Sequence, residues 1–270
     1  MNRIFIVGFA RSGTSLLHSI VAAYPEVTGF TESSYYFHKF VNPFERLPFP
    51  PLLSDRIYVP RLFESSNMTQ ILDEFYRENN ISSSQFSNND FILMLDIKSK
   101  EMGSDTWVEK STVHLRRIPI ISKRTPEAKF IHIIRRFSTV QKSWQNARVK
   151  LNLDFFDAPE KKILRYWKRD LIRTVQYVAK DDAHHMAISY ESLCNDTESV
   201  ISRISNFIGK SATYDYIMNK RINTDVVLDR ENWKNNVRSD ILPASGGDLC
   251  DDDLEAEKFY KGVVNVLLKC

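Results

Sequence analysis

Short apolar runs alternate with longer stretches of helical periodicity along most of the chain. Residues 4–7 and 130–134 are apolar runs with at most one polar interruption, the pattern of strands buried on both faces of a parallel sheet. Further candidate strands are residues 91–95, 107–108 and 186–190. Helical spacing predicts helices at residues 14–23, 66–78, 138–145, 159–179, 197–208 and 252–268. Strands that alternate with helices predict a three-layer α/β fold with a mostly parallel central sheet.

The length and composition are those of an ordinary globular protein. The chain has 270 residues, of which 43% are hydrophobic and 26% are charged, so we expect one domain that spans residues 1–270. Two stretches interrupt the alternation of strands and helices: the proline-rich residues 42–60 and the polar residues 79–90. Both are predicted to be surface loops.

Charge and cysteine content exclude several classes of protein. The formal net charge is only +3, which argues against a nucleic-acid partner. The three cysteines, Cys194, Cys250 and Cys270, form neither a disulfide framework nor a zinc-type spacing, so we expect no structural metal. The first residues run directly into the first predicted strand, and no apolar run is long enough to span a bilayer. We therefore expect a cytoplasmic protein.

A glycine-rich loop connects the first predicted strand to the first predicted helix. Gly8 and Gly13 have the G-x-x-x-x-G spacing of a phosphate-binding loop, as in proteins of the P-loop NTPase-like fold. Such a loop directs successive backbone N–H groups at an anion, and the helix that follows adds the positive end of its dipole. A glycine-rich turn without a ligand is the alternative interpretation.

The residue after the second glycine separates this loop from that of nucleoside-triphosphate enzymes. Those enzymes place a lysine there to reach the β- and γ-phosphates, whereas this chain has Thr14. Arg11 inside the loop offers a cation instead. The combination favours an anionic ligand that has no γ-phosphate and needs no magnesium.

Four segments, in order along the chain, together resemble the sulfotransferase family. Residues 4–17 with residues 23–27 are similar to the opening of family members, and residues 107–115 resemble the family's W-x-E-K-T-P-x-H-L segment. Residues 128–135 with Ser143 form the third block, and residues 188–193 with residues 207–209 form the fourth. The resemblance is strongest to the branch that includes bacterial and tyrosylprotein sulfotransferases.

The resemblance implies a donor, 3′-phosphoadenosine 5′-phosphosulfate (PAPS), and a set of residues that bind it. In the family the loop holds the 5′-phosphosulfate end, an Arg and a Ser equivalent to Arg135 and Ser143 hold the 3′-phosphate, and a Lys equivalent to Lys110 contacts the sulfate. The implied donor-binding residues are Arg11, Ser12, Gly13, Thr14, Ser15, Arg135, Ser143 and Tyr190.

The sequence departs from the family pattern at several positions. Ala10 replaces a proline that is frequent in the family, and Thr112 replaces another. Arg136 stands where the family often has an acidic residue, which leaves open how Arg135 is oriented. Beyond residue 209 the resemblance fades, and Arg230, Trp233 and Lys234 are weak candidates for a loop that closes over the nucleotide.

Sulfuryl transfer requires cations at the leaving phosphate oxygen and a base at the acceptor hydroxyl. Arg11 and Lys110 are the predicted cations. Glu32 is the predicted catalytic base, because it follows the first helix where the tyrosylprotein branch carries its glutamate. His38 and His114 are alternative bases.

The sequence therefore predicts a metal-independent, PAPS-dependent sulfotransferase that releases 3′,5′-adenosine bisphosphate (PAP). The acceptor is predicted to be a hydroxyl of a carbohydrate, glycolipid or small molecule, and residues 42–60 or 79–90 are candidates for an acceptor-side lid. One alternative is a kinase or NTPase, in which Asp96 at the end of the candidate strand 91–95 would bind magnesium. Another is a nucleotide-binding module without catalysis.

Overall fold

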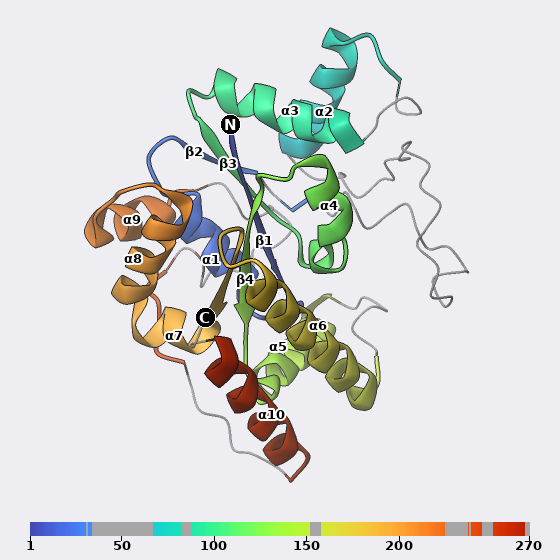
Figure 1. The fold of residues 1–270 in the computed structure, drawn as a ribbon, viewed down its shortest axis with the longest axis vertical. Helices are drawn as coiled ribbons and strands as arrows, with labels where there is room; N and C mark the ends of the chain where they lie inside the picture. Colours follow the sequence, from blue (N-terminus) through green and yellow to red (C-terminus); the bar gives the residue numbers. More distant parts are fainter. Residues whose placement is uncertain are drawn as a thin grey trace.

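The computed structural model contains a five-stranded sheet in which every pair of neighbouring strands is parallel (Figure 1). The strand order is β2-β3-β1-β4-β5. The strands are β1 (Asn2–Gly8), β2 (Val27–Phe30), β3 (Thr106–Lys110), β4 (Lys129–Ile134) and β5 (His185–Ser189). The structure describes residues 1–30, 32–33, 67–82, 88–151, 158–224, 237, 239–244 and 251–267. The predicted parallel α/β sheet is confirmed.

Helices cover both faces of this sheet because alternate side chains of the central strands point to opposite sides. On one face Ile4 and Ile6 of β1 pack with α1 (Thr14–Val21), α8 (Thr197–Ile208) and α9 (Tyr214–Arg221). On the other face Phe5 of β1 and Phe130 of β4 stack with their ring centroids 5.5 Å apart. That face is covered by α2 (Asn67–Glu78), α3 (Asn88–Glu101), η4 (Thr112–Arg116) and α4 (Ile118–Arg124).

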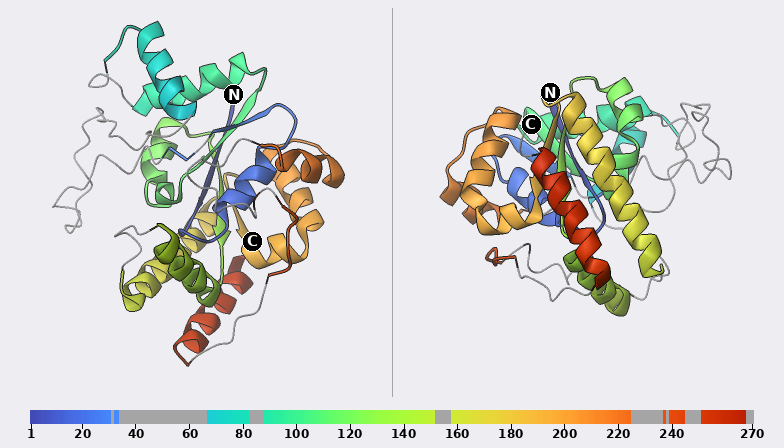
Figure 2. Two further views of the ribbon diagram at one scale, coloured as in Figure 1. Left: turned by 180° about the vertical axis from the view of Figure 1, so that it is seen from behind. Right: turned by 60° about the horizontal axis from the view of Figure 1, so that its bottom comes forward.

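A third apolar cluster lies beside the carboxyl end of the sheet. It joins α5 (Phe137–Leu151), α6 (Glu160–Lys180) and α10 (Asp251–Leu267), with Trp144 and Trp167 at its centre. The C-terminal helix α10 packs against both α5 and α6 (Figure 2). In the part of the chain that is described, no helix is both long and apolar enough to cross a membrane.

The prediction of a strand at residues 91–95 is wrong, because these residues lie within α3. Phe91, Ile92, Met94 and Leu95 are buried, whereas Leu93 between them is 46% exposed. This spacing is that of a helix face, which a short apolar run cannot reveal by itself. Asp96 therefore lies within a helix and not at a strand end. Its carboxylate accepts hydrogen bonds from the Arg3 side chain and from Trp107 Nε1.

Other differences concern the ends of elements. Tyr190 begins α7 (Tyr190–Asn195) rather than ending the strand β5, and β2 was not among the predicted strands. The predicted loop at residues 79–90 is interrupted by the start of α3 at Asn88. Residues 42–60 lie outside the described residues. The predicted helices near residues 14–23, 66–78, 159–179, 197–208 and 252–268 are confirmed within a few residues.

Candidate active site

The carboxyl ends of the parallel strands meet along one edge of the sheet, as they must when all strands run in the same direction. Gly8 of β1, Phe30 of β2, Lys110 of β3 and Ile134 of β4 are the last residues of their strands. The glycine loop, the predicted base and both predicted cations follow or end these strands. The topology therefore brings segments from the first 150 residues to one place.

The two glycines of the loop are required by close contacts. A Cβ atom added to Gly8 would lie 2.4 Å from the carbonyl oxygen of Ile133 on the neighbouring strand. Gly13 has a left-handed φ of 95°, and a Cβ there would lie 2.3 Å from Cδ2 of Tyr190. Because both glycines lack this atom, the loop can pass between β4 and the ring of Tyr190 before α1 begins.

The loop presents polar groups at the amino end of α1. Thr14 and Ser15 occupy the first turn of the helix, where backbone N–H groups have no partner within the helix. The hydroxyl of Ser12 is buried and has no hydrogen-bond partner in the described structure. A buried, unsatisfied hydroxyl costs free energy unless a ligand contacts it, so the loop has the properties of an anion site.

Arg135 follows β4 and is oriented without an acidic partner in the described structure. Its Nε donates to Thr139 Oγ1 at 3.1 Å, and its Nη1 donates to the carbonyl oxygen of Arg11 at 3.0 Å. Its guanidinium carbon lies 3.9 Å from the centroid of the Tyr190 ring, a cation–π contact. These contacts hold Arg135 in place, although the acidic residue that is frequent in the family is absent here.

Arg11 and Ser143 also meet at this point. Arg11 Nε donates to Ser143 Oγ at 3.1 Å, which connects the glycine loop to α5. Arg11, Gly13, Arg135, Ser143 and Tyr190, all predicted as donor-binding residues, thus belong to one continuous set of contacts.

Neighbouring elements fix the backbone and side chains around Arg135. Trp167 Nε1 of α6 donates to the carbonyl oxygen of Arg135 at 2.9 Å. Glu191 accepts hydrogen bonds from the backbone N–H of Arg136 and from the hydroxyl of Tyr260 on α10. Burial raises the pKa of Tyr190 to about 12, so its ring remains a neutral partner for Arg135.

The predicted base and a predicted cation form an ion pair at the end of β3. Lys110 Nζ contacts Glu32 Oε2. The lysine side chain is 3% exposed and the glutamate side chain 25% exposed, so solvent and ligands reach the pair from the glutamate side. The sequence placed these residues 78 positions apart, and the fold brings them into contact.

Glu109 precedes Lys110 on β3 and was not predicted as a site residue. Its Oε1 accepts hydrogen bonds from Ser33 N at 3.0 Å, Ser33 Oγ at 2.6 Å and Ser111 Oγ at 2.5 Å. Its Oε2 lies 3.0 Å from His114 Nδ1. Burial alone would raise the pKa of Glu109, but the charge and hydrogen bond of His114 and the two serine hydroxyls lower it to about 2. A charged Glu109 therefore ties the residue after Glu32 to the strand that carries Lys110.

Two histidines are buried near the same cluster. His114, an alternative base in the sequence, is fully buried beside Glu109. His18, which was not predicted, is fully buried with its Nε2 3.3 Å from the carbonyl oxygen of Val108. Burial and then the charge of Lys110 lower the pKa of His18 to about 4, so it is neutral at neutral pH. A histidine among the apolar positions of residues 14–23 was the available signal.

Several predicted residues lie outside the described part of the chain. These are His38, Arg230, Trp233 and Lys234. Among the residues that are described, no group of three His, Cys, Asp or Glu side chains could hold a metal ion.

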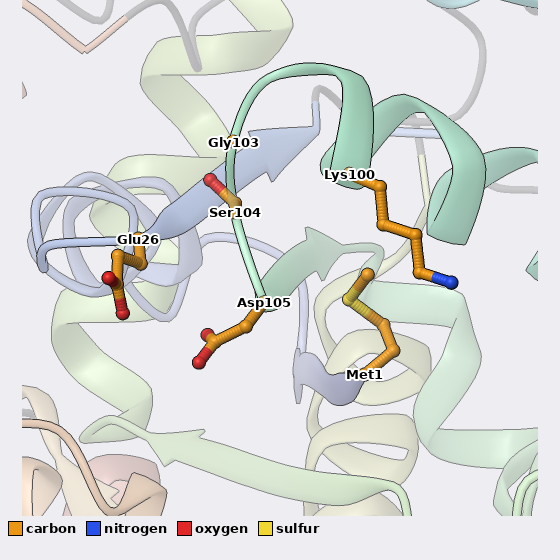
Figure 3. A pocket seen from close by; sticks show the side chains of 6 residues that line it. All are labelled: Met1, Glu26, Lys100, Gly103, Ser104 and Asp105. Atoms are coloured by element: carbon orange, nitrogen blue, oxygen red, sulfur yellow. The ribbon is translucent and has the colours of Figure 1, made fainter.

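A shallow pocket of about 340 Å³ lies at the opposite edge of the sheet (Figure 3). It is next to the amino ends of β1 and β3, and two of its carboxylates, Glu26 and Asp105, form ion pairs with Lys210 at 2.9 and 2.6 Å. This pocket is therefore separate from the candidate active site. Its lining residues are Met1, Glu26, Lys100, Gly103, Ser104 and Asp105.

Comparison with known proteins gives one matching family model and several similar folds. Residues 3–214 match the model of the sulfotransferase family. The fold is similar to that of the sulfotransferase domain of the Synechococcus PCC 7002 olefin synthase, with a TM-score of 0.64 and 19% identity over 96% of this chain and 94% of that one. It is also similar to a sulfotransferase from Alicyclobacillus acidocaldarius, with a TM-score of 0.53 and 17% identity over 99% and 94% of the two chains. At these identities the likeness shows the fold alone. No curated protein matches the chain.

Proposed function

Since the chain belongs to the sulfotransferase family, we propose that it transfers a sulfuryl group from PAPS to an acceptor hydroxyl and releases PAP. The acceptor we propose is a hydroxyl of a carbohydrate, a glycolipid or a small molecule. The observation that carries the proposal is the set of contacts that joins the glycine loop, Arg135 and Ser143 next to the Lys110–Glu32 pair.

The residues present fit a donor with two anionic ends. The first turn of α1 and the unsatisfied hydroxyl of Ser12 would hold the 5′-phosphosulfate end, together with the cation of Arg11. Arg135 and Ser143 would hold the 3′-phosphate, because a guanidinium and a hydroxyl suit a phosphate with two or more free oxygens. When bound, the donor supplies an activated sulfuryl group.

The side chains of the site can supply both kinds of assistance that the transfer needs. Lys110 and Arg11 place positive charge where the leaving phosphate oxygen becomes more negative as its bond to sulfur breaks. Glu32 accepts the proton of the acceptor hydroxyl while the new bond between oxygen and sulfur forms. Because Glu32 and Lys110 already contact each other, the base and the cation are positioned together before the reaction.

A kinase or NTPase is the alternative, and two observations weigh against it. Thr14 stands where a triphosphate enzyme needs a lysine. Asp96, the magnesium ligand of that hypothesis, lies on α3 and accepts hydrogen bonds from Arg3 and Trp107. The alternative therefore lacks its lysine, and Asp96 does not stand at a strand end.

Ligand-induced stabilisation tests the proposal. PAP without metal should raise the melting temperature, since a ligand at 100 times its Kd stabilises a protein by about 2.7 kcal/mol. The protein should then transfer label from sulfur-labelled PAPS to at least one member of a panel of glycans, lipids and phenols. Stabilisation by ATP with magnesium and none by PAP would instead support the alternative, and binding of PAP without any transfer would indicate a non-catalytic module.

A further inference from the structure

The charges of this chain are strongly segregated along the sequence. Residues 111–180 contain seventeen Lys and Arg but only five Asp and Glu, although the whole chain has a net charge of +3. The remaining residues therefore have nine more acidic than basic side chains. The basic segment forms η4, α4, β4, α5 and α6, which are green to yellow in Figure 1.

Three arginines of this segment surround one tyrosine. The guanidinium carbons of Arg116, Arg165 and Arg169 lie 5.6, 5.5 and 5.9 Å from the centroid of the Tyr166 ring. Arg116 comes from η4, and the other residues come from α6. Guanidinium groups that gather around one ring repel one another, and a bound anion would relieve that repulsion. We call Arg116, Arg165, Arg169 and Arg173 the α6 arginine cluster.

The cluster has more positive charge than its nearest carboxylate can neutralise. Asp170, which is buried, accepts hydrogen bonds from Arg116 at 3.2 and 2.9 Å and from Arg173 at 2.9 Å. Arg165 and Arg169 are exposed, and within the described ranges no carboxylate forms an ion pair with either of them. Asp170 thus pairs with two of the four guanidinium groups of the cluster.

The cluster adjoins the candidate active site. Trp167, the neighbour of Tyr166, donates to the carbonyl oxygen of Arg135. Arg116 lies in η4, which begins two residues after Lys110 and contacts β1. The donor would engage Arg11 and Arg135, so it does not explain the four arginines of the cluster. Arg165 and Arg169, which do not pair with Asp170, are available to the other reactant.

The extent of the basic face indicates what kind of molecule it fits. Lys162, Arg165, Arg169 and Arg173 recur every three or four residues along α6, and the first and last are roughly 16 Å apart at 1.5 Å per residue. A row of this length matches a polymer with repeated charges better than a single phosphate group. Guanidinium groups bind carboxylate and sulfate groups with paired hydrogen bonds.

We propose that the acceptor is an acidic polysaccharide, whose carboxylate or sulfate groups bind the α6 arginine cluster while a hydroxyl reaches Glu32. This inference rests on the proposed sulfotransferase function for the identity of the reacting group. Recognition of the polyanion itself can be measured without any turnover.

Binding of the full chain to polygalacturonate, with neutral dextran as the reference polymer, tests the inference. We expect binding to polygalacturonate that weakens as salt rises, and no binding to dextran. Replacing both Arg165→Glu and Arg169→Glu should weaken binding at least tenfold. Both side chains are exposed, and neither holds a buried partner, so this variant should fold. The double variant Lys100→Glu with Lys220→Glu changes the net charge equally on other helices, and it should bind within twofold of the parent.

Three results would overturn the inference. One is a parent chain that does not bind polygalacturonate, or that binds vesicles of phosphatidylglycerol or an RNA at least as tightly. Another is an α6 variant that retains the parent affinity. The third is an equal loss in the Lys100 and Lys220 variant, which would mean that only net charge matters. PAP-induced stabilisation, measured on the same samples, reports on the proposed function separately, so each idea can fail without the other.

Discussion

Glu32 carries the proton-transfer part of the proposed mechanism. It is the more exposed member of the ion pair with Lys110. Replacing Glu32→Gln keeps the shape but removes the base. We expect kcat to fall roughly a hundredfold or more, the usual contribution of a positioned base, while PAP binding by calorimetry is unchanged. Transfer at the parent rate would show that another group accepts the proton.

Glu109 acts on the reaction through its neighbours and is a positioning residue in this account. It holds Ser33 through both its backbone N–H and its hydroxyl, so it fixes the segment that carries Glu32. In Glu109→Gln one hydrogen-bond acceptor becomes a donor that faces other donors. We expect kcat to fall roughly tenfold or more, KM for PAPS to stay within about twofold, and the Ser33 amide to exchange faster.

Asp96→Asn is a matched control for this change. Asp96 is also a carboxylate that holds β3, through Trp107 Nε1, but it has no contact with Ser33. This variant should lose stability and keep kcat. If both variants lost only stability, or if both lost kcat equally, Glu109 would be an ordinary buried carboxylate rather than a positioning residue.

At the residue scale, sequence reasoning found the groups that stand at the ends of apolar strands. Arg135 follows such a run directly, Lys110 comes two residues after one, and Arg11 lies between two diagnostic glycines. Glu109 was missed because its role depends on Ser33, which is 76 residues away, and no local pattern encodes that contact. His18 was missed because a histidine on an apolar helix face has many possible roles.

Among the elements, the glycine loop and α7 depend on each other. Gly13 lies against Tyr190, which also contacts the guanidinium of Arg135. Gly13→Ala would both strain the left-handed backbone and force the added Cβ into the ring. We expect a loss of unfolding free energy of about 2 to 4 kcal/mol in urea titrations and weaker PAP binding.

Gly209→Ala separates the two effects of this substitution. Gly209 also has a left-handed φ, of 71°, but a Cβ there would have no neighbouring atom within 4 Å. Gly209→Ala should lower the free energy of unfolding by about 1 kcal/mol, the cost of a left-handed backbone alone. PAP binding should be unchanged. Equal costs at the two glycines would mean that contact between the loop and Tyr190 is unimportant.

The type of an element could be predicted where the segment was long enough for its apolar spacing to be distinctive. The long amphipathic helices α6 and α8 were identified from apolar spacing alone. Residues 91–95 were assigned to the wrong type because a five-residue apolar run fits a buried strand and a buried helix face equally well. The short strand β2 has only four residues, one of them glycine, and gives little periodic signal.

On the scale of the whole molecule, buried histidines predict how stability depends on pH. Burial lowers the pKa of His18 to about 4 and that of His185 to about 4, and it lowers the pKa of His132 well below 6.5. The unfolded chain therefore binds more protons than the folded chain as the pH falls below 6.5, and the free energy of unfolding decreases. For His18 the loss between pH 6.5 and pH 4 is roughly 3 kcal/mol.

Glu109 extends this acid sensitivity to lower pH. Its pKa is about 2 in the folded protein, so its stabilising contribution is complete above its ordinary pKa of about 4.5 and is lost as the pH falls from there toward 2. Urea unfolding at pH 7.5, 6, 5 and 4 measures the loss of stability that the buried histidines cause. The free energy of unfolding should fall less steeply with decreasing pH in His18→Gln. An unchanged pH dependence in that variant would contradict the role given to His18.

The whole-chain topology determines where the reactants can meet. All five strands point their carboxyl ends to one edge, so the glycine loop, Lys110 and Arg135 gather on one side of the molecule. The central claim is that this edge binds a sulfated nucleotide through the loop and Arg135. A crystal structure of the full chain with PAP tests it most directly. We expect the 5′-phosphate at the amides of residues 12–15 and the 3′-phosphate at Arg135 and Ser143, whereas PAP bound elsewhere, or ATP with magnesium in the loop, would contradict the account.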